Sequence, residues 1–349
     1  MSNAADNSFL RLTPLEDSAV KLFFESLSPI QAQLADPGVA EVMINDYRNV
    51  WVERRGVMTR LDLELGEAKL TGAIHSLASS VEKSARAGTA QGIINAGHKN
   101  LRIASVMRPT AIDGHAMAIR RHRDDYLRLP DYTAMGAFAK VHARDEHASD
   151  VHFAPDAENE VLMHALRELV IQRKNVLVSG GTSTGKTTFL NAMTAEIPHD
   201  QRVITIEDTQ ELKLTVPNRL RLLSNEEKGV TPRILLALCL RFRPDRIIVG
   251  ELRQGEAYDL LQALNTGHDG GLTSIHATTA RGALTRLESL AMLGVPPGAN
   301  WSLDNMRRNV ADCIDYVVHL RRTGNLRHVS EIVEVQGIEN NDYILKRVF

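Results

Sequence analysis

Cysteine is scarce in this sequence of 349 residues, which contains only Cys239 and Cys313. Both lie in apolar stretches that we expect to be helical. Two separate thiols do not build the disulfide framework of a small secreted protein, and they are too few for a cysteine-rich zinc site. This composition is typical of a protein that works in the reducing cytosol.

Long apolar runs are also lacking. No segment approaches the roughly 18 consecutive apolar residues by which a membrane-spanning helix is recognised. Residues 1–6 show none of the basic-then-apolar pattern of a secretory signal. We therefore expect a cytoplasmic protein whose contact with a membrane, if it has one, is peripheral.

Neither sign of charge is in excess, because Lys and Arg total 41 and Asp and Glu total 43. Such a balance provides no general attraction to nucleic acids or acidic membranes. Aromatic residues are also few, at 5%, and no segment interleaves them with basic residues. These observations argue against a nucleic-acid motor, although a local basic patch stays open.

The most informative stretch spans residues 180–188, which fit the phosphate-binding pattern G-x-x-x-x-G-K-[ST]. A predicted strand at 175–179 precedes it and a predicted helix at 186–197 follows, which is the context that the motif requires. Glycines let successive N–H groups face one anion, and the helix adds its positive N-terminal end. The sequence thus predicts binding of a nucleoside triphosphate. The expected contacts are Gly180, Gly181, Thr182, Ser183, Thr184, Gly185, Lys186, Thr187 and Thr188.

The chain divides into three predicted parts. Residues 1–126 form a smaller α+β domain, residues 127–158 a linker with prolines and mixed charges, and residues 159–349 an α/β domain. In the last part, strands alternate with helices, which predicts a mainly parallel sheet with its site at the carboxyl ends of the strands. The first domain is expected to contain helices over 23–34 and 68–85 and strands at 39–44, 49–53, 57–61, 101–107 and 116–120. The α/β domain is expected to contain further strands at 202–206, 246–251, 272–276, 316–320, 327–335 and 343–349.

Acidic residues at the ends of two predicted strands narrow the chemistry. Lys186 is expected to reach the β- and γ-phosphates, and the Thr187 hydroxyl to hold Mg²⁺. Glu251 ends the predicted strand 246–251, where a carboxylate holds the Mg²⁺ shell or polarises the attacking water. Glu207 follows the strand 202–206 and either acts as general base or caps the next loop. The sequence does not decide which carboxylate activates water.

His276 ends a third predicted strand, after the glycine-rich segment 267–271. A lone histidine is more often structural. Because His276 is expected beside a flexible glycine loop, we treat it as a candidate that contacts the γ-phosphate and reports hydrolysis to that loop. The Asn-Lys-x-Asp motif by which GTPases specify their base is absent from the sequence.

The end of the first domain is unusually basic. Arg120, Arg121 and Arg123 lie close together, with Arg102 and Arg108 upstream. Three interpretations are open: a solvated edge strand, a nucleic-acid patch, or arginines presented to the phosphates of a neighbour.

Four segments, in register, resemble the secretion ATPases of the VirB11 type, within the wider superfamily of type II and type IV secretion and pilus motors. The phosphate loop is the first. The others resemble the acidic box, the Walker B strand and the histidine box of that family, at residues 204–212, 243–253 and 266–277. Residues 39–45 and 50–54 resemble the N-terminal domain of the TrbB branch, which serves conjugation.

The resemblance implies a RecA-like ATPase core that uses ATP and Mg²⁺, with Thr187 and Glu251 at the metal. It implies catalytic roles for Lys186, Glu207, Glu251 and His276. It also implies a cytoplasmic homo-hexamer at the inner membrane, in contact with other components of a type IV secretion system and without sequence-specific binding of nucleic acid.

The resemblance further implies that arginines of the N-terminal domain reach the nucleotide phosphates. Arg120 and Arg121 match one such segment of the family, and Arg102 matches another. These three residues are therefore candidate site residues.

The leading hypothesis is a hexameric motor that hydrolyses ATP to ADP and phosphate. Its work would be the assembly of, or substrate transfer through, a type IV secretion or conjugation system. A type IV pilus or type II secretion motor of the same superfamily is the first alternative. A RecA-like nucleic-acid motor and a non-hydrolysing scaffold switched by ATP are the others.

Overall fold

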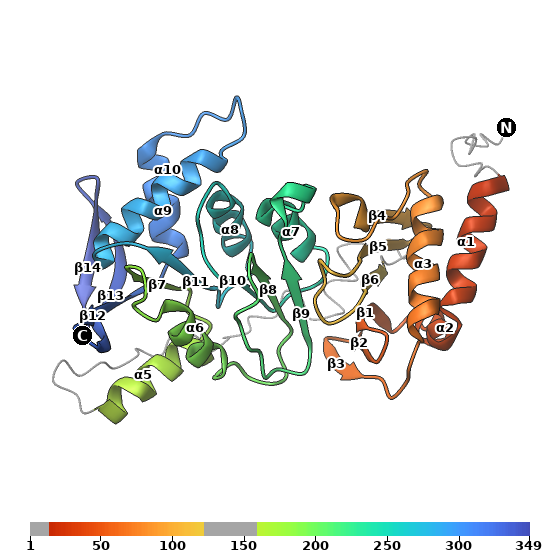
Figure 1. Cartoon of the computed structure of the whole chain (residues 1–349), viewed down its shortest axis with the longest axis horizontal. Helices are drawn as coiled ribbons and strands as arrows, with labels where there is room; N and C mark the ends of the chain where they lie inside the picture. Colours follow the sequence, from red (N-terminus) through yellow and green to blue (C-terminus); the bar gives the residue numbers. More distant parts are fainter. Residues whose placement is uncertain (1–13, 122–158) are drawn as a thin grey trace, which may run out of the picture. The chain divides into compact units, whose positions relative to one another are not determined.

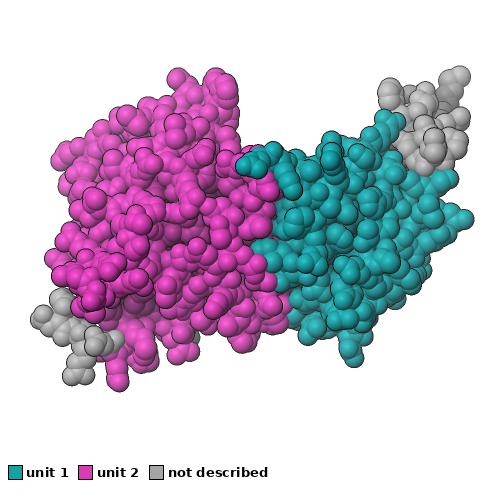
Figure 2. Space-filling view, in the orientation of Figure 1, with its two compact units in different colours: residues 1–124, 227–229 teal, residues 125–226, 230–349 magenta. Residues whose placement is uncertain are grey.

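In this computed structural model the chain forms two compact units (Figure 2), made of residues 1–124 with 227–229 and of residues 125–226 with 230–349. The structure describes residues 14–121 and 159–349. The predicted linker 127–158 lies outside the described residues, so the predicted domain boundaries stay predictions.

The first unit is built on a six-stranded sheet in the order β3-β2-β1-β6-β5-β4 (Figure 1), with every neighbouring pair antiparallel. The strands are β1 (Val39–Asp46), β2 (Asn49–Arg54), β3 (Val57–Arg60), β4 (Ile93–His98), β5 (Leu101–Val106) and β6 (Ala116–Arg121). Strand β4 was not predicted, because its asparagine, alanine, glycine and histidine are poor markers of a strand.

Two helices, α1 (Pro14–Ser26) and α3 (Glu67–Ser79), pack against each other beside this sheet. Together with the sheet they bury one apolar core, which includes Phe23, Ile74 and Met117. The unit is therefore the α+β domain that the sequence predicts.

The predicted continuous helix over 23–34 is wrong. Helix α1 ends at Ser26, a 3-10 turn η2 (Ser28–Ile30) follows, and α2 (Gln31–Ala35) is a separate short helix. Pro29 explains the break, since proline lacks the N–H that a helix interior needs and disfavours helical backbone at the residue before it. The apolar spacing continues across the break because η2 still buries Ile30.

The second unit contains an eight-stranded sheet in the order β14-β13-β12-β7-β11-β10-β8-β9. The six strands from β12 to β9 are parallel, and β13 and β14 are antiparallel additions at one edge. The strands are β7 (Val176–Gly180), β8 (Val203–Glu207), β9 (Arg219–Leu223), β10 (Arg246–Val249), β11 (Leu272–His276), β12 (Tyr316–Thr323), β13 (Leu326–Glu339) and β14 (Asp342–Arg347). The predicted α/β domain with a mainly parallel sheet is confirmed.

Helices cover both faces of this sheet (Figure 1), with α5 and α6 on one face and α8, α9 and α10 on the other. The α5–α6 face buries a core that includes Val178, Leu190 and Ile248. The helices are α5 (Asn159–Ile171), α6 (Lys186–Thr194), α7 (Pro232–Cys239), α8 (Glu256–Asn265), α9 (Ala280–Gly294) and α10 (Leu303–Cys313). Among the described residues, no helix is both long and apolar enough to cross a membrane.

Two predicted helix boundaries are confirmed by their caps. The Thr231 side chain accepts a hydrogen bond from the Ile234 N–H at the start of α7, with Pro232 at the first helical position. Gly267 has φ of +90° just after α8, the left-handed conformation that favours glycine at a helix end. Helix α10 was missed, because its sequence is rich in Asp, Asn and Arg and carries few apolar residues.

Candidate active site

The loop between β7 and α6 is shaped by two glycines with different tasks. A Cβ on Gly180 would lie 2.7 Å from the carbonyl oxygen of Leu320, so only glycine allows β12 to pass this closely. Gly185 immediately precedes α6. Its φ of +91° is a left-handed conformation, which residues with a side chain disfavour. The loop therefore curves tightly and delivers the N-terminus of α6 to its concave side.

A cavity of about 320 Å³ lies in this curve. Its lining brings together the phosphate loop and the ends of β10 and β11, as predicted. The lining residues are Thr182, Ser183, Thr184, Gly185, Lys186, Thr187, Thr188, Glu211, Glu251, Ser274, His276 and Arg327.

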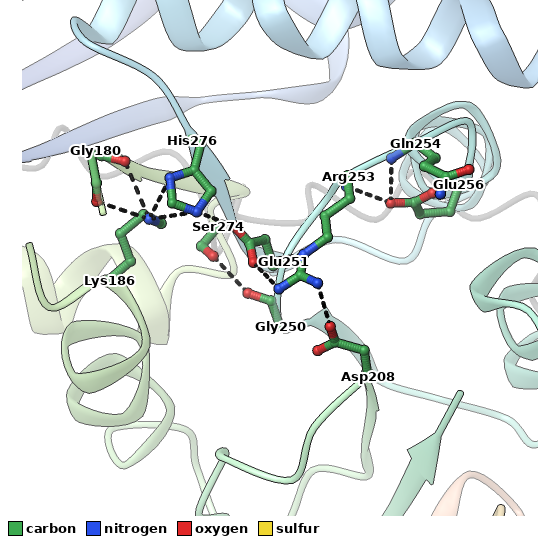
Figure 3. Close-up of polar contacts among 11 residues, drawn as sticks. Gly180, Lys186, Asp208, Gly250, Glu251, Arg253, Gln254, Glu256, Ser274 and His276 are labelled. Atoms are coloured by element: carbon green, nitrogen blue, oxygen red, sulfur yellow. Dashed lines mark hydrogen bonds and ion pairs between the residues drawn. The ribbon is translucent and has the colours of Figure 1, made fainter. Parts of the chain in front are cut away.

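Lys186 is buried at the centre of the site, with 8% of its surface exposed. Its Nζ donates to the carbonyl oxygens of Gly180 and Gly181 at 3.2 Å each and lies 3.2 Å from Nδ1 of His276 (Figure 3). Burial lowers the pKa of Lys186, an effect that the nearby Glu251 carboxylate partly opposes. The ammonium group is thus held inside the loop by weak neutral acceptors, which a phosphate oxygen replaces favourably.

Both carboxylate oxygens of Glu251 have a nitrogen-bearing side chain close to them (Figure 3). Oε1 lies 2.8 Å from Nε2 of His276, and Oε2 accepts from Nη2 and Nε of Arg253 at 2.7 and 2.9 Å. Arg253 also pairs through Nη1 with Asp208 at 2.6 Å. These contacts join residues that follow β8 and β10 to the last residue of β11.

The turn after β10 is fixed separately, by Glu256. Its Oε1 accepts from the backbone N–H groups of Arg253 and Gln254 at 2.6 and 2.9 Å. Ser274 in β11 donates to the carbonyl oxygen of Gly250 at 2.7 Å. The backbone that carries Glu251 is therefore anchored on both sides.

The sequence left two roles open for Glu207, a general base or a cap of the next loop. The structure shows the contacts of a loop cap. Its Oε1 accepts from the backbone N–H groups of Glu211 and Leu212 at 2.8 and 2.7 Å. The residue is 5% exposed, and burial raises the pKa of its carboxyl group. A catalytic role for Glu207 stays a prediction.

This geometry provides what hydrolysis of a nucleoside triphosphate needs. It combines a nest of N–H groups, a buried lysine, and a carboxylate paired with an imidazole. The Thr187 hydroxyl and the Glu251 carboxylate line the same cavity, and oxygen donors of these two types suit Mg²⁺.

A comparison of the sequence with known protein families agrees with this interpretation of the site. Residues 86–323 match the family described as "Type II/IV secretion system protein". The chain belongs to this family.

Individual relatives show which branch of the family this secretion ATPase resembles. It is 32% identical over 317 residues to the conjugal transfer protein TrbB of Rhizobium radiobacter, covering 89% of this chain and 88% of the relative. It is 32% identical over 325 residues to the type IV secretion system protein VirB11 of Brucella suis, covering 88% of each. The crystal structure of the Brucella suis VirB11 ATPase with sulphate superposes with a TM-score of 0.80 at 31% identity, over 91% of this chain and 96% of that one. The protein is a VirB11-type ATPase, and the predicted fold class is confirmed.

One expectation about the ATPase is wrong: His276 does not lie beside the glycine-rich loop. That loop precedes β11, whereas His276 is the last residue of the strand. The loop is tied down at the far edge, where buried Arg246 donates to the Gly270 carbonyl oxygen and Asn175 accepts from the Gly271 N–H. A signal from His276 to this loop would have to cross the full length of β11.

Sequence reasoning missed three residues that line the cavity of the ATPase: Glu211, Ser274 and Arg327. Glu211 and Ser274 lie inside segments that resemble the family boxes, so their position was a usable signal. Arg327 lies in β13, far along the chain, and nothing in the sequence connects it with the phosphate loop.

The three candidate arginines of the first unit, Arg102, Arg120 and Arg121, differ in their surroundings. Arg120 and Arg102 are direct cross-strand partners on β6 and β5, so their exposed side chains share one face of the sheet. Arg121 points to the other face, is half-buried, and donates to the Leu34 carbonyl oxygen. Whether any of them contacts nucleotide stays a prediction.

Proposed function

We propose that this ATPase assembles as a homo-hexamer and couples hydrolysis of ATP to the work of a type IV secretion or conjugation system. The observation that carries the proposal is the juxtaposition in one cavity of Lys186, the Glu251–His276 pair and the phosphate loop. The names of the TrbB and VirB11 relatives support the setting.

In this proposal the cavity binds the triphosphate through the N–H groups of 182–188 and through Lys186. The lysine exchanges the Gly180 and Gly181 carbonyl oxygens for phosphate oxygens, which are stronger acceptors because they are charged. Thr187 and Glu251 would hold Mg²⁺, which neutralises charge that develops on the phosphates.

Glu251 is the group best placed to polarise the attacking water. It has 16% of its side chain exposed, lines the cavity, and is oriented by His276 and Arg253. Glu207, in contrast, uses one carboxylate oxygen to hold the loop that carries Glu211. We therefore assign water activation to Glu251 and a positioning role to Glu207.

Of the arginines in the first unit, Arg120 and Arg102 are the ones we assign to phosphate contact. Their side chains lie opposite each other on adjacent strands and can share one anion, while buried Glu41 pairs with Arg120 from the other side, on β1. Arg121 already has the Leu34 carbonyl oxygen as its acceptor.

The remaining parts of the proposal concern the setting. They are a hexameric ring in the cytoplasm, peripheral contact with the inner membrane, and partners among the other components of the secretion apparatus. The TrbB relative favours conjugation as the process served, because it is named for conjugal transfer.

The decisive experiment measures phosphate release by the purified full chain and by Lys186→Ala. We expect the variant to lose turnover, while Lys21→Ala, an exposed lysine on α1, keeps it. Near-normal hydrolysis by Lys186→Ala would overturn the mechanism. Strong stimulation by single-stranded DNA, with no hexamer seen by light scattering in ATP, would revive the nucleic-acid motor.

A further inference from the structure

Arg327 approaches the phosphate loop from the flank opposite to the catalytic residues. The sheet order places β12 on one side of β7 and β11, β10 and β8 on the other. Glu251 and His276 come from the β10–β11 side. Arg327 comes from the hairpin β12–β13, where it pairs across the strands with Arg322.

The side chain of Arg327 lies against the loop itself. Its Cδ is 3.5 Å from the point where a Cβ on Gly185 would sit, and the residue lines the cavity. Gly185 immediately precedes Lys186, so the guanidinium group reaches the cavity beside the N-terminus of α6. A Cβ at position 185 would be in ordinary van der Waals contact with this arginine.

The guanidinium group of Arg327 has no hydrogen bond or ion pair with any residue of 14–121 or 159–349, unlike Arg253 across the site, which pairs with two carboxylates. An arginine keeps its charge at every physiological pH, whereas burial lowers the pKa of Lys186. The guanidinium group of Arg327 is thus permanently charged, and its N–H groups are available to an anion in the cavity.

We propose that Arg327 binds, within the same chain, the α- and β-phosphates that ATP and ADP share. This inference rests on the proposed function and adds a residue to its nucleotide site. Backbone N–H groups of a phosphate loop cradle the α- and β-phosphates, and Arg327 lines the same cavity beside Gly185, one of the residues of that loop. In this proposal the γ-phosphate lies on the other side of the cavity, near Glu251 and His276.

A contact to the shared diphosphate has a distinctive consequence. It stabilises substrate and product complexes alike, so it raises affinity without favouring the transition state. Loss of the contact should therefore appear mainly in KM and Kd, in contrast to loss of Glu251, which should appear in kcat.

The experiment uses the full chain and calorimetric titration with ADP and with the non-hydrolysable analogue AMP-PNP. For Arg327→Ala we expect Kd to rise about tenfold or more for both ligands, as for loss of a charged hydrogen-bond donor. Arg327→Lys should recover part of the loss, because it keeps the charge but not the two-pronged geometry. In phosphate-release assays the loss in kcat/KM should lie mainly in KM.

Arg321→Ala is the matched control. Arg321 is an exposed arginine of the same hairpin, adjacent in sequence to the cross-strand partner of Arg327, and its side chain points to the opposite face. We expect its Kd for ADP to stay within about twofold of the parent value. Circular dichroism melting checks that each variant is folded.

Unchanged affinity of Arg327→Ala for ADP would overturn the inference, and so would an equal loss in Arg321→Ala. Weaker binding of AMP-PNP alone would move Arg327 to the γ-phosphate and reject the diphosphate contact. If the parent protein binds ADP through Arg327 but releases no phosphate from ATP, the proposed function fails and this inference stands.

Discussion

The imidazole of His276 bridges the carboxylate of Glu251 and the ammonium group of Lys186. Its Nε2 lies 2.8 Å from Oε1 of Glu251, and its Nδ1 lies 3.2 Å from Nζ of Lys186. Nε2 of the same ring lies 3.4 Å from Nζ of Lys186, so the lysine is close to both ring nitrogens. The last residue of β11 therefore lies between the carboxylate of Glu251 and the ammonium group of Lys186.

Removal of this bridge should slow hydrolysis more than it weakens binding. In His276→Ala, Glu251 loses one of its two orienting partners and keeps Arg253. We expect kcat to fall by about tenfold to a hundredfold, with the Kd for ADP nearly unchanged, because ADP lacks the γ-phosphate. Phosphate release and ADP titration measure the two quantities. A parallel loss in both would make His276 a binding residue.

Glu251→Gln should separate binding from chemistry. The amide keeps the shape of the carboxylate but cannot polarise water as a base, so kcat should fall by at least about a hundredfold. Bound ATP should remain intact on the protein after gel filtration, detected by chromatography of the extracted nucleotide. If the variant still turns over rapidly, water activation must be reassigned to another carboxylate.

Glu207→Gln should reveal a buried carboxyl group through the pH dependence of stability. Burial raises the pKa of Glu207 above its ordinary value of 4.5, so the folded chain binds its proton more tightly than the unfolded chain. The stabilising effect of that proton is present below pH 4.5 and is lost as pH rises through the raised pKa. Glutamine does not titrate, yet its carbonyl oxygen still accepts from Glu211 and Leu212.

Relative to the parent, Glu207→Gln should therefore gain stability as pH rises from the ordinary carboxyl pKa toward neutrality. Melting temperatures of both proteins across this range provide the measurement. Parallel curves would show that the carboxyl group titrates alike in the folded and unfolded chains. Turnover of the same variant tests the competing catalytic role, which requires a large loss in kcat.

The two adjacent arginines of β6 should respond differently to removal. Arg120→Ala should slow hydrolysis with little change in melting temperature, because its side chain is exposed beside Arg102. Arg121→Ala should cost on the order of 1 kcal/mol of stability, because its guanidinium group donates to the Leu34 carbonyl oxygen. An unchanged rate in Arg120→Ala would return that residue to the solvated edge of the sheet.

Local rules account for the parts of the fold that were predicted correctly. Strands β8 and β10 are short and rich in isoleucine and valine, with Glu207 at the end of β8 and Gly250 just after β10, and the phosphate loop has its own spacing rule. Pro29 carries its own signal for a helix break, but the apolar spacing from Phe23 to Leu34 outweighed it in the prediction. Strand β4 and helix α10 are held by tertiary packing, which leaves little trace in a local pattern.

The sequence by itself determined that residues 180–188 form a phosphate-loop pattern between a strand and a helix, and that Glu207, Glu251 and His276 lie at or just after the ends of three strands, because both follow from spacing along the chain. Only the tertiary structure decided what those residues touch. It paired Glu251 with His276, turned Glu207 to the loop after it, and brought Arg327 to Gly185 from more than a hundred residues away. Side-chain contacts across a sheet depend on strand order, and strand order is set by the packing of the whole domain.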